Sequence, residues 1–473
     1  MQPLPGYFIL QANQAAPFMI FKSTKAVSGK FAAGNGQNLL LNPAALAPLS
    51  ASTIETNPHR SYVMQWNFNI QRQIVPDLTL TLGYVGSHAV HLLFRGDDGN
   101  MTGTGLAGTP SVQLTSAGYL FPCGYPTIAG APNGPTSCTP GFTGGVNGTA
   151  TTPPGGGANA QVNQALGVIR YIYWNSDSNY HALDVNLQKT LTHGVQFQVA
   201  YSFAKSLDDS SQTIAGDTFG NGLNAPFWFL PKVFRGPSDF NVTHTISING
   251  LWDIPTPKSL GGFARTALGG WEVGGILAIN SGVPTTPIIG GDPLGLGNSG
   301  TDQFGLPNRV PGCDPILHGY AGSAPGSPNW INPNCFTLPM VSASSPLAPQ
   351  CGDFSQASHA PPALPSGMVY CANLLGNVGR NSLYGPRFVN LDFSILKNFP
   401  IKSISEAFNI QFRAEFFDIT NHDNFVPPQP GSGDGNAALF NSDGSPTGAG
   451  QITLFANGQQ PAREIQFAIK VNW

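Results

Sequence analysis

The chain has 473 residues and a formal net charge of −3, and only 10% of its residues are Asp, Glu, Lys or Arg. A typical soluble protein carries roughly 25% of these residues, so the composition argues against an ordinary water-facing surface. The near-neutral balance, without a basic stripe, gives no reason to expect nucleic acid as a partner. Glycine (58 residues) and proline (42 residues) are abundant, which indicates many turns and loops.

Neither a membrane-spanning helix nor an export signal is expected within this chain. No run of about 18 apolar residues occurs, as a transmembrane helix would require. The first residues, MQPLP, lack a positively charged segment followed by an apolar one, so we expect no signal peptide here.

The six cysteines all lie in segments rich in glycine and proline, and none forms a CxxC pair. Their spacing therefore argues against a zinc or redox motif. An even number of cysteines confined to loops suits disulfides in an oxidising compartment, with buried free thiols as the alternative. Many pairings are possible, and pairing of sequence neighbours is one hypothesis: Cys123–Cys138, Cys313–Cys335 and Cys351–Cys371.

Alternation of apolar and polar residues with a period of two is the main structural signal of the chain. In the first segment, Tyr62, Met64 and Trp66 alternate with Val63 and Gln65. Such alternation predicts a strand with one apolar and one polar face. It recurs in order along the chain and predicts nine strands and no helix, at 62–71, 78–84, 183–188, 195–203, 246–254, 271–279, 389–395, 408–416 and 465–473.

Two architectures fit these strands, a soluble β-sandwich or jelly roll and a transmembrane barrel. Soluble strands average about 5–6 residues, whereas strands that cross a bilayer need about 9–11, and most of these segments come closer to the second length. Charges in mid-strand fall on the polar face, namely Asp184, Asp253, Glu272, Asp392, Arg413, Glu415, Glu464 and Lys470. Basic residues on the apolar face lie at strand ends, where long side chains can reach the membrane interface: Arg72, Lys189, Lys205, Lys397 and Arg463. Aromatic residues at strand ends are typical of interfacial girdles: Tyr62, Tyr84, Trp252, Trp271 and Trp473.

The connections between strands favour the barrel. Short or medium turns lie at about 75–77, 192–194, 255–269 and 400–405, and long connections at about 94–179, 207–241, 284–386 and 420–460. Short turns on one side and long loops on the other are typical of outer-membrane barrels, and structureless loops this long count against a compact soluble domain. The sequence therefore predicts an all-β, antiparallel transmembrane β-barrel of the cell outer membrane, with short periplasmic turns and long extracellular loops.

The order of the connections also orients the chain. It places residues 1–61 outside the cell and Trp473 at the periplasmic side. A complete bacterial barrel has an even number of strands, so an odd number implies a strand that is missing or unrecognised. Residues 5–23 could supply it, but we favour a truncated chain, with residues 1–61 as a loop or strand remnant and 62–473 as the barrel region.

Several segments resemble the C-terminal barrel region of Oar-like TonB-dependent receptors (carboxypeptidase-regulatory-like outer-membrane proteins). In chain order they are QWN at 65–67, LGYVGS at 82–87, YSFAKSLDD at 201–209, GWEVGG at 270–275, SGVP at 281–284, GNVGRN at 376–381, FRAEFFD at 412–418, NH at 421–422 and REIQF at 463–467. The resemblance implies a barrel of about 22 strands with a plugged lumen. It also implies an N-terminal plug and a TonB box, neither of which is visible in this chain, so TonB could act only through that absent region.

The sequence shows no catalytic constellation. GxSxG, HExxH and P-loop motifs are missing, and we expect no enzyme activity, no cofactor and no metal site. Asp208 and Asp209 are expected to belong to a solvated loop. His422 is interpreted as a polar residue at a strand end and not as a ligand.

Two features carry functional hypotheses. Arg413 and Glu415 face inward, two residues apart on one strand, where they could contact a plug or the lumen, or be satisfied by the neighbouring wall. The last strand places a stripe of apolar residues on one face, which resembles the signal recognised by the barrel-assembly machinery, here Phe467, Ile469, Val471 and Trp473. Such a strand offers an edge that β-augmentation can receive, and it also suits a lipid-facing final strand.

Two functions remain open. The first is a receptor or transporter barrel that takes up an unknown ligand with the absent plug and TonB, its loops forming the binding surface. The second is a structural or adhesive outer-membrane protein that acts through its extracellular loops. An encoded plug and TonB box upstream would favour uptake. The expected partners are outer-membrane lipid, the barrel-assembly machinery and that ligand.

Overall fold

The computed structural model describes residues 9–10, 49–96, 112–121, 166–211, 227, 230–257, 259, 261–290, 293–294, 305–320, 329–352, 354, 363–401, 408–428, 437–441, 444–452 and 463–472. A 12-stranded sheet dominates it. Each of its long strands pairs antiparallel with the long strand that follows it in the sequence. They are β3 (Tyr62–Val75), β4 (Leu78–Gly96), β7 (Leu166–Thr192), β8 (Val195–Asp208), β10 (His244–Asp253), β11 (Trp271–Asn280), β19 (Phe388–Pro400), β20 (Asn409–Phe417) and β22 (Glu464–Asn472). Every strand predicted from the alternation is present, so the predicted all-β antiparallel fold is confirmed.

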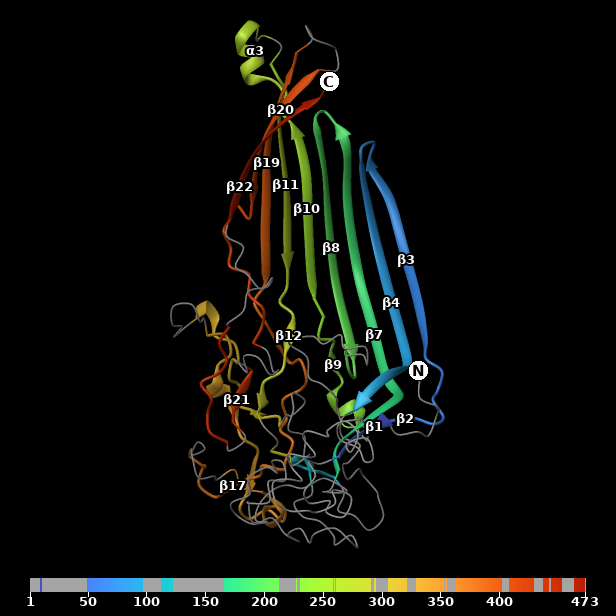
Figure 1. Cartoon of the computed structure of the whole chain (residues 1–473), viewed down its shortest axis with the longest axis vertical. Helices are drawn as coiled ribbons and strands as arrows, with labels where there is room; N and C mark the ends of the chain where they lie inside the picture. The colour runs from blue at the N-terminus through green and yellow to red at the C-terminus, as the bar shows by residue number, and fades with distance from the viewer. Residues whose placement is uncertain are drawn as a thin grey trace, which may run out of the picture.

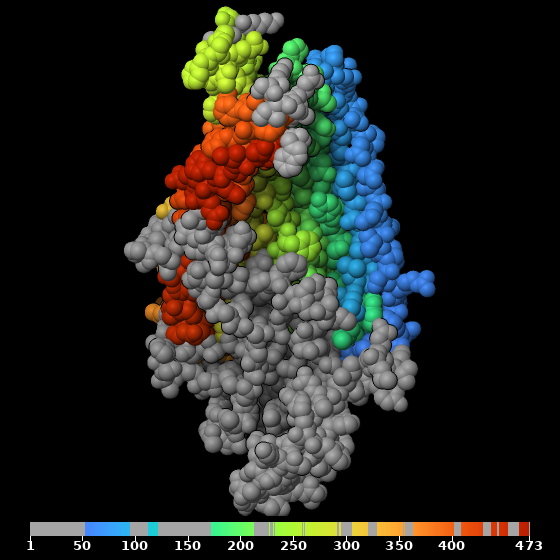
Figure 2. All heavy atoms as spheres, turned by 45° about the horizontal axis from the view of Figure 1, so that its top comes forward, coloured from blue at the N-terminus to red at the C-terminus, as the bar shows by residue number. Residues whose placement is uncertain are grey.

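These long strands form a curved wall. They run side by side along the longest dimension of the molecule (Figure 1). The first strands and the last strands lie on opposite sides of a hollow (Figure 2). Within the described residues β3 pairs only with β4, and β22 pairs only with β20, so the wall is open and not a closed barrel.

One close contact shows how sequence and register fit together in the wall. Trp66 on β3 is the register partner of Gly86 on β4. A Cβ atom added at Gly86 would lie 2.4 Å from the Trp66 indole, so the ring lies directly over the glycine backbone. An aromatic ring that covers a cross-strand glycine replaces the packing that the glycine lacks.

The short connections lie together at one end of the wall, at the top of Figure 1. The β7–β8 hairpin turns through His193 (φ 54°) and Gly194 (φ 77°), and such a two-residue turn with both φ positive matches the twist of the strands. The connection between β10 and β11 contains α3 (Gly262–Leu268), so the expectation of no helix was wrong. Seven residues are too few to show the helical periodicity that sequence reading relies on.

Two strands extend further than the alternation indicated. β4 continues to Gly96 and β7 begins at Leu166, whereas the sequence predicted a connection from about 94 to about 179. The register shifts between Ala89 and Leu92, where His91 has a φ of 54°, and this bulge interrupts the period-two pattern. With 27 residues, β7 is far longer than the roughly 9–11 residues that a strand needs to cross a bilayer.

The clusters of buried apolar residues lie in the long connections and not in the wall. Val112, Phe227, Phe234 and Leu294 belong to one cluster, and Ile331 belongs to a second. We call the described residues within 112–121, 209–243, 281–387 and 418–463 the loop body. The long connections were expected to be structureless, and this expectation was wrong for the loop body.

Short paired segments and disulfides fix the loop body. Cys313 is joined to Cys335 and Cys351 to Cys371, as the pairing of sequence neighbours expected, while Cys123 and Cys138 lie outside the described residues. The paired segments are β5 (Gln113–Thr115) with β6 (Gly118–Leu120), β12 (Pro284–Thr285) with β18 (Leu383–Tyr384), β13 (Ile288–Ile289) with β21 (Ala438–Phe440), β14 (Asn308–Arg309) with β15 (Phe336–Thr337), and β16 (Met340–Ser342) with β17 (Met368–Tyr370). Single 3-10 turns lie at Pro231–Phe234, His318–Tyr320, Pro333–Cys335 and Ala348–Gln350.

The N-terminal part contributes two short strands at the loop-body end of the wall. β1 (Ile9–Leu10) pairs with β2 (Leu49–Ile54), and β2 pairs in parallel with the beginning of β7. Of residues 5–23, which could have supplied a further wall strand, only Ile9 and Leu10 are described. No helix in the described part of the chain combines the length and apolar character needed to cross a bilayer.

Candidate functional site

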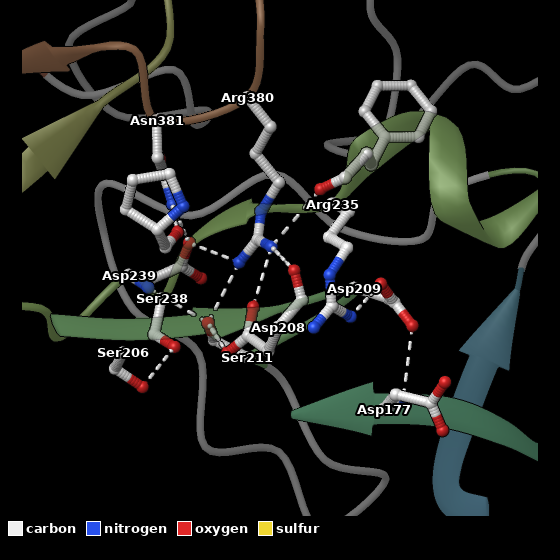
Figure 3. A network of polar contacts seen from close by, with 12 residues as sticks. Asp177, Ser206, Asp208, Asp209, Ser211, Arg235, Ser238, Asp239, Arg380 and Asn381 are labelled. Carbon is white, nitrogen blue, oxygen red and sulfur yellow. Dashed lines mark hydrogen bonds and ion pairs between the residues drawn. The ribbon is translucent and has the colours of Figure 1, made fainter. Parts of the chain in front are cut away.

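A buried arginine lies where the wall meets the loop body. The Arg380 side chain is 1% exposed, and its Nη1 donates to Asp208 Oδ1 at 2.7 Å. Its Nη2 donates to Asp239 Oδ1 and to Ser211 Oγ, both at 2.8 Å (Figure 3). Nη1 also donates to the backbone carbonyl of Asp208 at 3.1 Å. One buried guanidinium therefore binds two carboxylates, a hydroxyl and two backbone carbonyls, those of Asp208 and Phe234.

The residues of this cluster come from distant parts of the chain. Asp208 is the last residue of β8, and Asp239 follows β9 (Gly236–Pro237), which pairs with the end of β8. Arg380 lies 172 residues beyond Asp208, just before β18. The ion pairs therefore connect one of the longest connections directly to the end of a wall strand.

Asn381 supports the same junction from the next position. Its Nδ2 donates to the Pro237 carbonyl at 2.7 Å and to Asp239 Oδ1 at 2.6 Å. Its backbone N–H donates to Thr286 Oγ1 at 2.8 Å. Asn381 has a φ of 55°, a left-handed conformation that asparagine tolerates better than most residues with a side chain.

A second ion pair extends the cluster to β7. Arg235 Nη1 donates to Asp209 Oδ1 at 3.0 Å, and the other Asp209 oxygen accepts from the backbone N–H of Asp177 at 3.0 Å. Arg235 Nη2 donates to Asn179 Oδ1 at 2.5 Å. We call Asp208, Asp209, Arg235, Asp239, Arg380 and Asn381 the arginine junction.

Burial and charge together set the protonation of the junction. Burial alone would lower the pKa of Arg380, but Asp239 and Asp208 together raise it, so the guanidinium stays charged. Burial raises the pKa of Asp209, and the hydrogen bonds from Asp177 and Arg235 offset only part of that rise. Buried charges of this kind persist only when they are paired and hydrogen-bonded, as they are here.

The solvated loop expected for Asp208 and Asp209 was wrong. The two residues are 4% and 0% exposed. Their partners Arg380 and Arg235 are remote in sequence, so no local pattern reveals the pairing. A usable signal was present, because segments 201–209 and 376–381 both belong to the family resemblance and the fold brings them into contact.

The other residues singled out from the sequence lie away from this junction. Arg413 on β20 donates from Nε to Gln411 Oε1 at 2.6 Å, and its register partner is Leu396. Glu415 lies opposite Ser394, and these two charged residues form no ion pair with each other in the described structure. A plug or lumen contact for Arg413 and Glu415 stays a prediction.

The end of the chain presents an apolar edge. On β22, Phe467 is 66% exposed, Ile469 is 72% exposed and Val471 is 43% exposed, while Trp473 lies outside the described residues. Recognition of this stripe by the barrel-assembly machinery stays a prediction. His422 Nδ1 lies 3.2 Å from Asn424 Oδ1, in the turn that follows β20, as a polar strand-end residue would. Within the described residues, no three His, Cys, Asp or Glu side chains lie close enough together to hold a metal ion.

The geometry and the family comparison define the class of protein. A wall of long alternating strands, with short turns at one end and a large loop body at the other, is the architecture of an outer-membrane barrel. The outer membrane beta barrel domain family matches residues 4–466, and the chain belongs to this family. The predicted fold class and location in the cell outer membrane are therefore confirmed.

Solved structures of outer-membrane proteins are also similar in part. One is the outer membrane transporter YddB from Escherichia coli, with 10% identity and a TM-score of 0.36, covering 90% of this chain and 34% of that chain. Another is BauA, the ferric preacinetobactin receptor from Acinetobacter baumannii, with 8% identity and a TM-score of 0.29, covering 87% of this chain and 29% of that chain. This chain therefore spans about a third of the length of these proteins. None of the curated proteins matches it.

Proposed function

We propose that the chain forms the loop-bearing wall of an outer-membrane receptor that takes up a ligand with a plug and TonB supplied from outside this chain. The observation that carries the proposal is the arginine junction, which fixes the loop body to the ends of the wall strands. A receptor needs a binding surface that is preorganised, because ordering loops during binding lowers the affinity. Loops that served only as spacers would not need buried ion pairs, which are expensive to desolvate.

The polar face of the wall supports the same proposal. Gln198 Nε2 donates to Asn186 Oδ1 at 2.9 Å across β7 and β8. Asn409 and Gln411 both donate to Asn398 Oδ1 at 3.0 Å across β19 and β20. Such amide ladders suit a wet lumen, which is the polar side of an outer-membrane barrel. The proposal includes no catalytic step, no cofactor and no resident metal.

The resemblance to Oar-like TonB-dependent receptors supports the part of the proposal that concerns energy, namely that TonB drives the uptake. The motif segments occur in the family's order over residues 62–473. Two of them supply residues of the arginine junction: 201–209 contains Asp208 and Asp209, and 376–381 contains Arg380 and Asn381. Uptake driven by TonB would act through a plug, so the region that supplies the plug must be present in any test.

The test compares three strains of the native host: the intact strain, one without the complete gene for this protein and one without TonB. Uptake is followed as depletion of compounds from the growth medium by mass spectrometry, and surface adhesion is measured in parallel. The proposal expects the same compounds to remain in the medium of both deletion strains. Adhesion that falls only in the strain without this protein, with unchanged depletion, would favour the adhesive alternative and overturn uptake.

A further inference from the structure

Histidines gather at the loop-body end of the first wall strands. Of the nine histidines in the chain, five lie on or next to β3, β4, β7 and β10, away from the short turns: His59, His88, His91, His181 and His244. Three of these five, His88, His181 and His244, lie on the apolar face of the wall. Imidazoles are polar and are unusual on a hydrophobic face, so their position there points to a role other than packing.

Two of these imidazoles, those of His181 and His244, are held in the same way, whereas His88 Nδ1 lies 3.1 Å from the backbone carbonyl oxygen of Ser178. The Tyr84 hydroxyl lies 2.8 Å from His181 Nδ1, and the Tyr201 hydroxyl lies 2.9 Å from His244 Nδ1. In both pairs the rings are nearly parallel, at 16°. In the tautomer in which the tyrosine hydroxyl donates to Nδ1, the ring hydrogen lies on Nε2, and each imidazole then presents an N–H donor to its surroundings.

A cation and further aromatic rings complete the row. Lys205 on β8 is exposed and is the register partner of His181, so the two side chains stand side by side. The Trp66 ring lies 6.1 Å from His181, and the Phe203 ring lies 5.1 Å from His244. We call this row the histidine belt: Trp66, Tyr84, His181, Tyr201, Phe203, Lys205 and His244.

Its height on the wall places the histidine belt at a membrane interface. Trp252 follows His244 by eight residues on β10, with Ile246 and Ile248 on the same face between them. Eight residues at about 3.4 Å each cover roughly 27 Å along the strand. At a tilt of about 40° this is roughly 20 Å across the membrane, close to the apolar band of about 25 Å that aromatic girdles flank. The belt therefore lies at the outer-leaflet headgroups, on the side of the loop body.

We propose that the histidine belt binds the phosphorylated headgroup of a glycolipid in the outer leaflet. An ammonium group and two imidazole N–H donors in one row suit phosphate oxygens, because charge-assisted hydrogen bonds are the stronger ones. The faces of Trp66, Tyr84 and Tyr201 suit the sugar rings and the upper acyl chains, since aromatic side chains are favoured at the interface. The inference concerns the lipid face of the wall and does not depend on the proposed uptake function.

A control residue lies on the same apolar face at the other end of the wall. Lys189 on β7 donates to Thr192 Oγ1 near the β7–β8 turn. Lys205→Gln and Lys189→Gln therefore remove the same charge from opposite interfaces. A double variant, His181→Gln with Lys205→Gln, removes both neighbouring donors of the belt.

The experiment uses the complete protein purified from outer membranes in mild detergent, with a heat-modifiability gel to select folded variants. Binding of bisphosphorylated lipid A is compared with binding of chemically dephosphorylated lipid A and of phosphatidylglycerol. The proposal expects the double variant to bind the phosphorylated probe about tenfold more weakly, since two charge-assisted contacts are lost, while Lys189→Gln binds like wild type. Equal binding of the phosphorylated and dephosphorylated probes, an equal loss in Lys189→Gln, or equally strong binding of phosphatidylglycerol by the wild type would each overturn it.

Discussion

At the scale of single residues, Arg380 contributes more to the arginine junction than any of its partners. It contacts both Asp208 and Asp239, whose side chains are 5% and 0% exposed, and its own side chain is 1% exposed. Removing one carboxylate leaves the arginine with the other. Removing the arginine leaves two buried carboxylates without their common cation, which is far less favourable because a buried unpaired charge is strongly destabilising.

Replacement of Arg380 by methionine should therefore loosen the loop body. Breaking a buried ion pair by deleting one partner costs about 3–5 kcal/mol, and we expect a loss of this size in the stability of the loop body. Limited proteolysis of the protein in detergent micelles would measure it as faster cleavage within the loop body. Arg309→Met, which removes an exposed arginine from β14, is the matched control and should leave the cleavage rate unchanged. Equal cleavage of both variants would contradict the prediction.

The pKa of Asp209 gives the junction a dependence on pH. Burial raises this pKa, so the folded loop body holds the proton more tightly than the unfolded chain, whose aspartates titrate at about 3.9. The contribution of Asp209 to stability is therefore full below that value and is lost as the pH rises through the folded pKa. The variant Asp209→Asn should gain stability relative to wild type as the pH rises, measured by proteolysis rates across that window.

Asp314 serves as a control because its pKa is shifted in the direction opposite to that of Asp209. The backbone N–H of Ile316 and the side chain of His318 lower its pKa, so its contribution is present at higher pH and is lost on acidification. Asp314→Asn should therefore lose stability relative to wild type as the pH rises. If Asp209→Asn and Asp314→Asn moved in the same direction, the assignment of opposite shifts would be wrong.

At the scale of elements, α3 depends on a lysine from a neighbouring strand. Lys397 on β19 is 2% exposed, and its Nζ donates to the carbonyls of Thr266, at 2.7 Å, and Gly269. Its ammonium also lies over the rings of Trp271 and Phe399, at 5.3 Å and 4.9 Å from their centroids. Cations that bind the last carbonyls of a helix satisfy acceptors that the helix leaves open. The sequence placed Lys397 at a strand end on the apolar face, but it could not show that α3 covers the ammonium.

Lys397→Met should release α3 while the strands remain paired. The variant removes the donor for two carbonyls at the C-terminal end of a seven-residue helix, which is too short to be stable alone. Hydrogen exchange at residues 262–268 should become faster, while exchange in β10 and β11 stays slow. Lys470→Met, which removes an exposed lysine from β22, should change neither. Protection of α3 that survived in Lys397→Met would show that the helix is held by other contacts.

At the scale of the whole molecule, the wall could be predicted from the sequence, whereas the loop body could not, apart from its disulfides between sequence neighbours. Wall contacts join strands that follow one another, and alternation with period two identifies each strand separately. Contacts of the loop body join distant residues, as when Asn373 Nδ2 donates to the carbonyl of Phe121, 252 residues away. Asp208 and its partner Arg380 are also far apart, by 172 residues, so no local sequence pattern predicts this ion pair. Local patterns predict elements, whereas the arginine junction depends on how those elements meet.

The wall and the loop body should therefore lose their structure separately. A bridge that closes a loop of about 20 residues contributes roughly 3 kcal/mol, and Cys351–Cys371, with a sequence separation of 20, lies entirely within the loop body. The double variant Cys351→Ser with Cys371→Ser should make the loop body more sensitive to protease. The heat-induced gel shift of the barrel should stay as in wild type, because no wall strand contains either cysteine. Loss of the gel shift together with loop-body protection would show instead that the two parts form one cooperative unit, and the arginine junction would then transmit the damage from one to the other.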